Sequence, residues 1–202
     1  ELLRAGKIDE EYLIRYTNVH WLVIQNPGGA DHGLFVRDDD DVAQCWDGEK
    51  QALAANTDVN AKPTLVGEIT LSDGRKAVPS FQLLAEHYLD DQYAPEAVAS
   101  KTGIDADTIR RVATELAEVA FEQSIELDIE WTDVFGRKHD KVIGRPVSMH
   151  AMRGISAHTN GFHTCRAIHI LQLLLGSIDV PGGMRFKPPY PKALYSLPKP
   201  MG

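Results

Sequence analysis

Residues 158–183, HTNGFHTCRAIHILQLLLGSIDVPGG, form the stretch that decides the fold of this chain. A polar turn ends at Gly161, and the apolar run that follows predicts one long helix. The second half of this run, IHILQLLL, is apolar nearly all round, which predicts a buried helix. Because a strand expected at residues 146–152 leads into the turn, we predict an α/β fold: a Rossmann-like layered domain with helices flanking a mixed or parallel sheet, plus a small β-hairpin region.

Basic side chains lie near the start of this helix. At about 100° per residue, His163, Arg166 and His169 share an arc of roughly 120°. A guanidinium on a buried helix needs a partner, because an unpaired buried charge is costly. Arg166 therefore either forms an ion pair with an acidic residue elsewhere in the fold or faces a pocket that holds an anionic substrate or cofactor.

The turn before the helix favours the pocket. Gly161 permits a close backbone approach, and Thr159 and Asn160 can cap the helix. The free N–H groups of a first helical turn form an anion site, and α/β folds usually bind ligands at such a place. The residues alone therefore predict an anion pocket at the start of the helix.

Composition excludes several classes of protein. A formal net charge of −8 over 202 residues argues against a general nucleic-acid binder. Two cysteines, Cys45 and Cys165, cannot build a disulfide framework or a Cys-rich metal or iron–sulfur site. The histidines do not have the i,i+4 spacing of a helical metal site, so no metal ligand is predicted among His150, His158, His163 and His169.

The rest of the chain is predicted to form three regions. Residues 1–24 are expected to contain a helix and a strand, residues 25–79 loops and a hairpin, and residues 80–202 an α/β region that ends in the cofactor-facing helix and a tail. Within the third region, residues 125–131 alternate like a strand, whereas residues 132–145 have the composition of a loop.

Local signals predict where the helices begin and end. Asp9, Ser80 and Asp105 are expected to be N-caps. Pro95 fits a first helical turn, and Gly103 fits a C-terminal stop. The chain has no initiator Met and opens on ELLRAGKI, which is typical of the end of a helix, so we expect an interior piece of a longer polypeptide.

Three phrases occur in an order that resembles the dimethyl-sulfoxide-reductase family of molybdopterin oxidoreductases. They are IDEEYLIRYTN (8–18), YAPEAVASKTGIDADTIRRVATELA (93–117) and HTNG followed by TCRAIHILQLLLGSIDVPGGM (158–184). The chain resembles an interior part of the large catalytic subunit. Two further stretches, 144–169 and RFKPPYPK (185–192), are most similar to the branch of sulfite dehydrogenases and thiosulfate and polysulfide reductases, with sulfite dehydrogenase first.

The resemblance implies a bis(molybdopterin guanine dinucleotide) cofactor with molybdenum and two-electron chemistry on a sulfur oxyanion. It implies that Arg166 points into the substrate funnel with His163 beside it. The remaining turn residues would lie against the pterin or its phosphates: His158, Thr159, Asn160 and Gly161. A [4Fe–4S] cluster and the molybdenum ligand would belong to segments outside these residues, so the chain alone is expected to hold no molybdenum and to be inactive.

The resemblance also implies partners: the remainder of the catalytic subunit, an iron–sulfur electron-transfer subunit and a membrane anchor subunit. The expected location is the cytoplasmic side of the membrane, held there through the partner subunits, with the periplasm as the alternative. Two other interpretations stay open at this point. One is a formate dehydrogenase-type molybdoenzyme, and the other is a stand-alone α/β module that binds an anion or phosphate.

Overall fold

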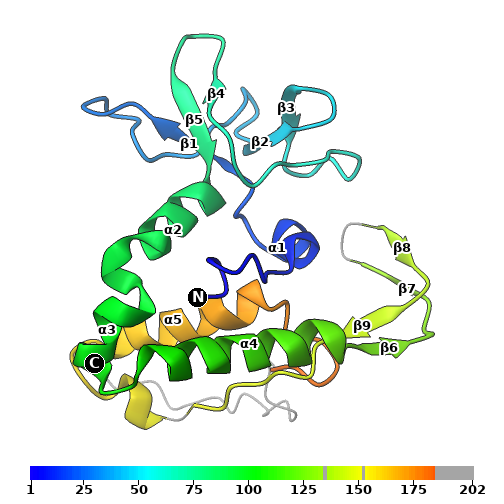
Figure 1. Ribbon diagram of the computed structural model, residues 1–202. Coiled ribbons are helices and arrows are strands. Elements are labelled where there is room, and N and C mark those ends of the chain that lie inside the picture. The colour runs from blue at the N-terminus through cyan, green and yellow to red at the C-terminus, as the bar shows by residue number, and fades with distance from the viewer. Residues whose placement is uncertain (134–135, 152, 185–202) are drawn as a thin grey trace, which may run out of the picture.

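The computed structural model describes residues 1–133, 136–151 and 153–184, so the stretch RFKPPYPK and the rest of the predicted tail lie outside the described residues. A strand-rich part lies above a helical part, and a two-stranded ribbon projects from the helical part (Figure 1). The described chain contains both helices and sheets, which confirms the α/β class.

The strand-rich part is built from short antiparallel strands. Its sheet has the order β1-β5-β4, with β1 at Leu22–Gln25, β4 at Ile69–Thr70 and β5 at Lys76–Pro79. The predicted hairpin with an Asp-Gly turn is confirmed by the β4–β5 pair. A second hairpin, β2 (Gln44–Asp47) with β3 (Ala52–Ala55), was not predicted within the loop-rich stretch. The three-stranded sheet and the segments beside it share a small apolar core, and Trp46 of β2 packs against it; the core consists of Leu22, Ile24, Val36, Ile69, Leu71 and Ala77.

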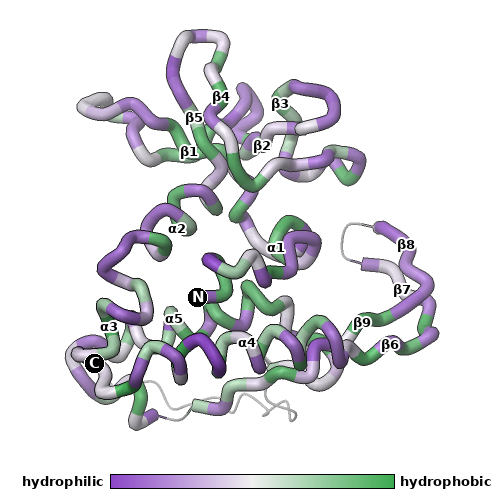
Figure 2. Tube along the Cα trace, in the orientation of Figure 1, coloured by the Kyte–Doolittle hydropathy of each residue, from purple (hydrophilic) through white to green (hydrophobic). Residues whose placement is uncertain are grey.

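The helical part has five α-helices within the described ranges. They are α1 (Glu10–Tyr16), α2 (Ser80–Leu89), α3 (Pro95–Thr102), α4 (Ala106–Glu122) and α5 (Gly161–Leu174). The helix α4 alternates between hydrophilic and hydrophobic stretches in Figure 2, as an amphipathic surface helix does. The main core joins α1, α2, α4 and α5 through Leu2, Leu13, Leu65, Phe81, Ala117, Ala120, Val147, Leu174 and Leu175. Two 3₁₀ helices complete this part: Asp91–Tyr93 and Arg153–Ser156.

The helix ends follow their local signals closely. Asp9 caps α1 by accepting a hydrogen bond from the Tyr12 backbone N–H at 2.9 Å, and Asp105 caps α4 by accepting one from the Thr108 N–H at 2.8 Å. Gly103 ends α3 with φ +73°, a left-handed conformation that glycine adopts without strain. Three of the predicted ends are thereby confirmed.

The predicted N-cap at Ser80 is wrong by one residue. Pro79 occupies the N-cap of α2, and Ser80 is the first residue of the helix. The Ser80 hydroxyl donates instead to the Asn18 carbonyl at 3.0 Å. The local capping rule expects the Ser80 hydroxyl to cap the helix, but this hydroxyl bonds to a residue 62 positions away in sequence.

A long ribbon fills the stretch that was predicted as strand and loop. β6 (Ile125–Leu127) pairs with β9 (Val142–Gly144), and β7 (Trp131–Thr132) pairs with β8 (Lys138–His139). The returning half is polar at β8 and has only a short apolar run at β9, so it lacks the alternation of apolar residues that marks a longer strand. The loop prediction for residues 132–145 is therefore wrong at Thr132, Lys138–His139 and Val142–Gly144 and holds for the other described residues of this stretch.

The strand predicted at residues 146–152 and the Rossmann-like parallel sheet are not seen in the described residues. Residues 145–151 have no regular secondary structure, because Pro146 has no N–H to donate and the Val147 N–H bonds locally to the Arg145 carbonyl at 2.7 Å. Every pair of named strands in the described ranges is antiparallel. No helix in these ranges has the length and apolar content needed to cross a bilayer.

Candidate functional site

The start of α5 offers backbone donors. The Gly161 N–H bonds to the His158 carbonyl at 2.9 Å, and the Thr164 N–H bonds to the Asn160 carbonyl at 2.9 Å. The N–H groups of the two intervening residues belong to the first helical turn, which has no intrahelical acceptors. Asn160 occupies the N-cap as predicted, but its side chain makes no capping bond, and Thr159 lies in the preceding turn. Within the described residues, the two intervening N–H groups therefore have no acceptor.

Gly161 is required by packing inside the chain. A Cβ at this position would lie 2.1 Å from the Ser156 carbonyl oxygen, which belongs to the 3₁₀ helix before the turn. The close backbone approach at Gly161 is thus made with the chain's own backbone, and its contact with a ligand stays a prediction. The glycine thus sets how the turn folds onto the start of α5.

Replacing Gly161 with Ala is expected to lower the stability of the fold by about 1–3 kcal/mol, because the Ser156 backbone has to move. Gly154→Ala is the matched control, since nothing lies within 4 Å of its Cβ position. The unfolding midpoints of both variants in denaturant give the comparison. Equal midpoints for the two variants would contradict the packing role.

The exposed half of α5 carries the predicted catalytic residues. His163 and Arg166 are exposed, and Phe162 is 75% exposed. Within the ranges that the structure covers, neither His163 nor Arg166 has an ion pair or a side-chain hydrogen bond. An internal ion pair was one alternative for Arg166, and no acidic residue in the described ranges forms it.

The prediction of a buried helix is wrong for the first half of α5, where most side chains are exposed, and holds in part for the second half, whose residues are buried or half-buried. Gln172 and Leu174 are buried in the second half. The part of α5 that is apolar nearly all round begins only at Ile168, so the enclosed part of the helix begins there. His158, Thr159 and Asn160 are exposed as well, whereas Gly161, the fourth residue predicted to contact the cofactor, is buried against Ser156.

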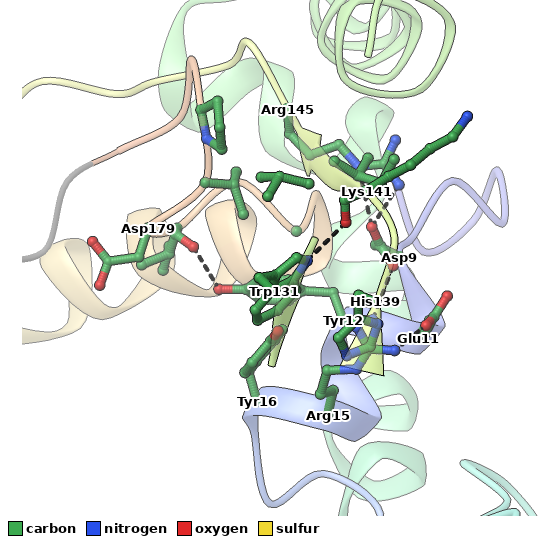
Figure 3. A pocket seen from close by; sticks show the side chains of 16 residues that line it. Asp9, Glu11, Tyr12, Arg15, Tyr16, Trp131, His139, Lys141, Arg145 and Asp179 are labelled. Atoms are coloured by element: carbon green, nitrogen blue, oxygen red, sulfur yellow. Dashed lines mark hydrogen bonds and ion pairs between the residues drawn. The ribbon is translucent and has the colours of Figure 1, made fainter. Parts of the chain in front are cut away.

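Two of the three phrases found in the sequence meet at the other end of α5. The Asp9 backbone N–H donates to the Leu174 carbonyl at 2.8 Å, and the Tyr12 hydroxyl donates to the Ile178 carbonyl at 2.9 Å (Figure 3). Gly176 has φ +63°, and a Cβ there would lie 2.7 Å from an Asp9 carboxylate oxygen. The GSIDVPGG turn is thus packed directly on the start of α1.

A partly buried ion pair holds this junction together. Arg145 donates to Asp9 Oδ2 through Nη2 at 2.7 Å and through Nε at 3.1 Å, and its Nη1 donates to the Ala120 carbonyl at 3.1 Å. The Arg145 guanidinium also lies over the Phe121 ring, 5.0 Å from its centre. The sequence pattern did not single out Arg145, because its partner lies 136 positions away.

A cavity of about 640 Å³ opens beside this ion pair, between α1, the ribbon and the turn after α5 (Figure 3). Trp131 stacks on His139 with ring centres 4.5 Å apart and donates its indole N–H to the Lys141 carbonyl at 2.7 Å. Burial, with a smaller effect of Asp179, raises the pKa of Tyr12 to about 12, so its hydroxyl stays protonated and keeps donating. These contacts join α1, the ribbon and the turn after α5 around the cavity.

Metal-binding and nucleophilic groups do not gather in the parts of the chain that the structure covers. No group of three or more His, Cys, Asp or Glu side chains is placed to hold a metal ion there. Cys45 is fully buried, and burial raises the pKa of its thiol to about 11, which keeps it protonated. Cys165 is half-buried on α5.

Acid is expected to destabilise the fold through His20, which is 5% exposed. Burial, helped by the charge of Arg137, lowers the pKa of His20 from 6.5 to about 4. The unfolded chain therefore binds this proton more readily, so the stability is fully present above about pH 6.5 and is lost as the pH falls towards 4. The loss reaches about 3 kcal/mol.

Unfolding in urea between pH 7 and pH 4.5 tests this expectation. His20→Gln is expected to be less sensitive to acid than the wild type. The exposed His87 provides the control variant His87→Gln, which should keep the wild-type pH dependence. If the stability of His20→Gln falls with pH as steeply as that of the wild type, other groups cause the loss of stability.

Comparison with known proteins identifies relatives among the subunits of dehydrogenases. The chain is homologous to subunits of oxidoreductases, which confirms the resemblance predicted from its three phrases. It is 46% identical over 99% of its length to a sulfite dehydrogenase subunit of Allochromatium vinosum. It is also 25% identical over 90% of its length to the formate dehydrogenase major subunit of Haemophilus influenzae.

The matched region is a small share of both relatives. The chain spans 21% of the length of the sulfite dehydrogenase subunit and 15% of the length of the formate dehydrogenase major subunit. No protein-family model matches the chain. The word "subunit" in the name of the first relative indicates that this relative works in a complex of several subunits.

Proposed function

We propose that the chain is part of the catalytic subunit of a molybdenum oxidoreductase that acts on a sulfur oxyanion by two-electron transfer. Sulfite oxidation is the first choice of reaction, and reduction of thiosulfate or polysulfide is the second. The observation that carries the proposal is the 46% identity to the sulfite dehydrogenase subunit over almost the whole chain. The open surface at the start of α5 supports it.

The start of α5 fits an anionic group. Two backbone N–H groups there have no capping side chain, and Arg166 and His163 project from an exposed surface without partners in the described ranges. A helix N-terminus and a guanidinium both favour anions, and Arg can hold an oxyanion through two parallel N–H bonds. These residues therefore suit the diphosphates of a bis(molybdopterin guanine dinucleotide) cofactor and an oxyanion substrate beside it.

Each residue has its own role in this proposal. Arg166 orients the oxyanion, and His163, three positions earlier on the same helix, lines the same funnel. His158, Thr159 and Asn160 lie against the pterin or its phosphates. Gly161 contributes by letting the turn pack on Ser156. The cofactor, when bound, supplies the two-electron redox chemistry.

The complete enzyme is proposed to contain parts beyond these residues. They are a [4Fe–4S] cluster, the molybdenum ligand, an iron–sulfur electron-transfer subunit and a membrane anchor subunit. The proposed location is the cytoplasmic side of the membrane, with the periplasm as the alternative. A formate dehydrogenase-type activity is the second candidate function, and the 25% identity to the formate dehydrogenase major subunit favours it.

Metal analysis and a substrate screen on the native polypeptide that contains these residues test the proposal. We expect molybdenum in the purified protein and turnover of sulfite, thiosulfate or polysulfide with an artificial electron carrier. Turnover of formate alone would support the second candidate. Purified protein without molybdenum, or without activity on any of the four compounds, would contradict both.

A further inference from the structure

A second cavity, of about 320 Å³, lies where the end of α1 meets the strand-rich part. The residues that matter for its chemistry come from four segments: Arg15 on α1, His20 in the turn before β1, Asn56 and Asp58 after β3, and Arg137 in the ribbon. It shares no residue with the start of α5. Its volume is near the lower end of the range for small-molecule pockets.

Three polar atoms at this cavity have no hydrogen-bond partner among the described residues. They are Arg15 Nε, His20 Nδ1 and Asn56 Oδ1. All three are shielded from bulk solvent, and the His20 residue as a whole is only 5% exposed. Buried polar groups are nearly always paired, so three unpaired ones from different segments around one cavity point to an absent ligand.

Two cations, Arg15 and Arg137, and one carboxylate, Asp58, line the cavity. Arg15 uses Nη2 for its i,i+4 pair with Glu11, whose side chain is 77% exposed, and its buried Nε has no partner among the described residues. Arg137 is close enough to help lower the pKa of His20. The Asp58 carboxylate already accepts from the Asn60 N–H at 2.9 Å and lies 3.7 Å from Lys50 Nζ.

We propose that this cavity binds a small oxyanion of the sulfate or phosphate type, which accepts hydrogen bonds from Arg15 and Asn56 within the field of Arg137. A half-turn of the Asn56 amide exchanges Oδ1 for the Nδ2 donor at no cost in shape. His20 is neutral at pH 7 and can donate from Nδ1. The site is separate from the α5 surface and does not rest on the proposed function.

Calorimetric titration of the native polypeptide with sodium sulfate and sodium phosphate at pH 7, with chloride holding the ionic strength constant, tests this site. Arg15→Gln removes the guanidinium, and Asn56→Asp places a carboxylate against the ligand. Arg111→Gln is the matched control, because Arg111 forms an exposed i,i+4 pair with Glu115 as Arg15 does with Glu11. Arg166→Ala removes anion binding at the α5 surface.

We expect at least one of the two oxyanions to bind, with a Kd that rises about tenfold or more in Arg15→Gln and in Asn56→Asp. The Kd should stay unchanged in Arg111→Gln and in Arg166→Ala. If Arg15→Gln does not fold, as circular dichroism will show, the result with Asn56→Asp decides.

Three results would overturn the proposal. Absence of binding by the wild type would mean that the cavity holds water alone. Equal weakening in Arg111→Gln would reveal a general charge effect. Loss of binding in Arg166→Ala alone would place the anion at the start of α5.

Discussion

Arg166→Ala is expected to lower kcat/KM for the oxyanion substrate by about 100- to 1000-fold, which is the usual loss when one donor to a reacting oxyanion is removed. The unfolding midpoint should stay within error of the wild type, because Arg166 is exposed and has no ion pair within the described ranges. Steady-state kinetics with an artificial electron carrier, alongside thermal unfolding, give the two readouts.

Two further variants separate the effect of the charge at position 166 from that of the donor geometry. Arg166→Lys keeps the charge but not the two-pronged donor, so it should recover only part of the activity. Arg111→Ala, on the exposed face of α4, should leave kcat/KM unchanged. A large loss of stability in Arg166→Ala with normal activity would instead assign Arg166 a structural ion pair outside the described residues.

Asp9→Ala is expected to destabilise the fold by about 3–5 kcal/mol, because it leaves the partly buried Arg145 guanidinium without its carboxylate and also removes the α1 cap. Asp105→Ala is the matched control. Asp105 is likewise an N-cap aspartate, but it is part of no ion pair in the described ranges, so its loss should cost only about 1 kcal/mol.

Denaturant unfolding of Asp9→Ala, Arg145→Met and the double variant measures how strongly the two side chains depend on each other. We expect the double variant to be much less destabilised than the sum of the single ones, because removing both partners leaves no buried charge. Additive losses would contradict the ion pair as the cause. If Asp9→Ala loses no more stability than Asp105→Ala, Asp9 acts as a helix cap alone.

Local features were predictable because their causes lie within a few residues. The caps at Asp9 and Asp105 and the stop at Gly103 each depend on a side chain or backbone conformation and the next turn of helix. The resemblance to dehydrogenase subunits was also carried by short phrases. Gly161, the first residue of α5, predicted a close approach, and the structure identifies Ser156 as its neighbour.

Long-range features could not be predicted from pattern. The returning side of the ribbon consists of two short strands without an apolar alternation, so no pattern marks it. The order of the residues also does not show which segment Arg145 contacts. Whether a helix is enclosed depends on what packs around it. The same rule that predicted burial for all of α5 holds only where Leu174 meets the core from α1 and α4.

The sequence by itself determined the stretch from His158 to Gly183 as a polar turn followed by a long helix, and it singled out Arg166 and His163. These depend on side-chain chemistry and helical spacing, which the order of residues states directly. Only the tertiary structure decided that the N-terminal end of α5 is exposed and that its C-terminal end is hydrogen-bonded to Asp9. Burial and ion pairing depend on residues far apart in the chain, and folding alone brings those residues together.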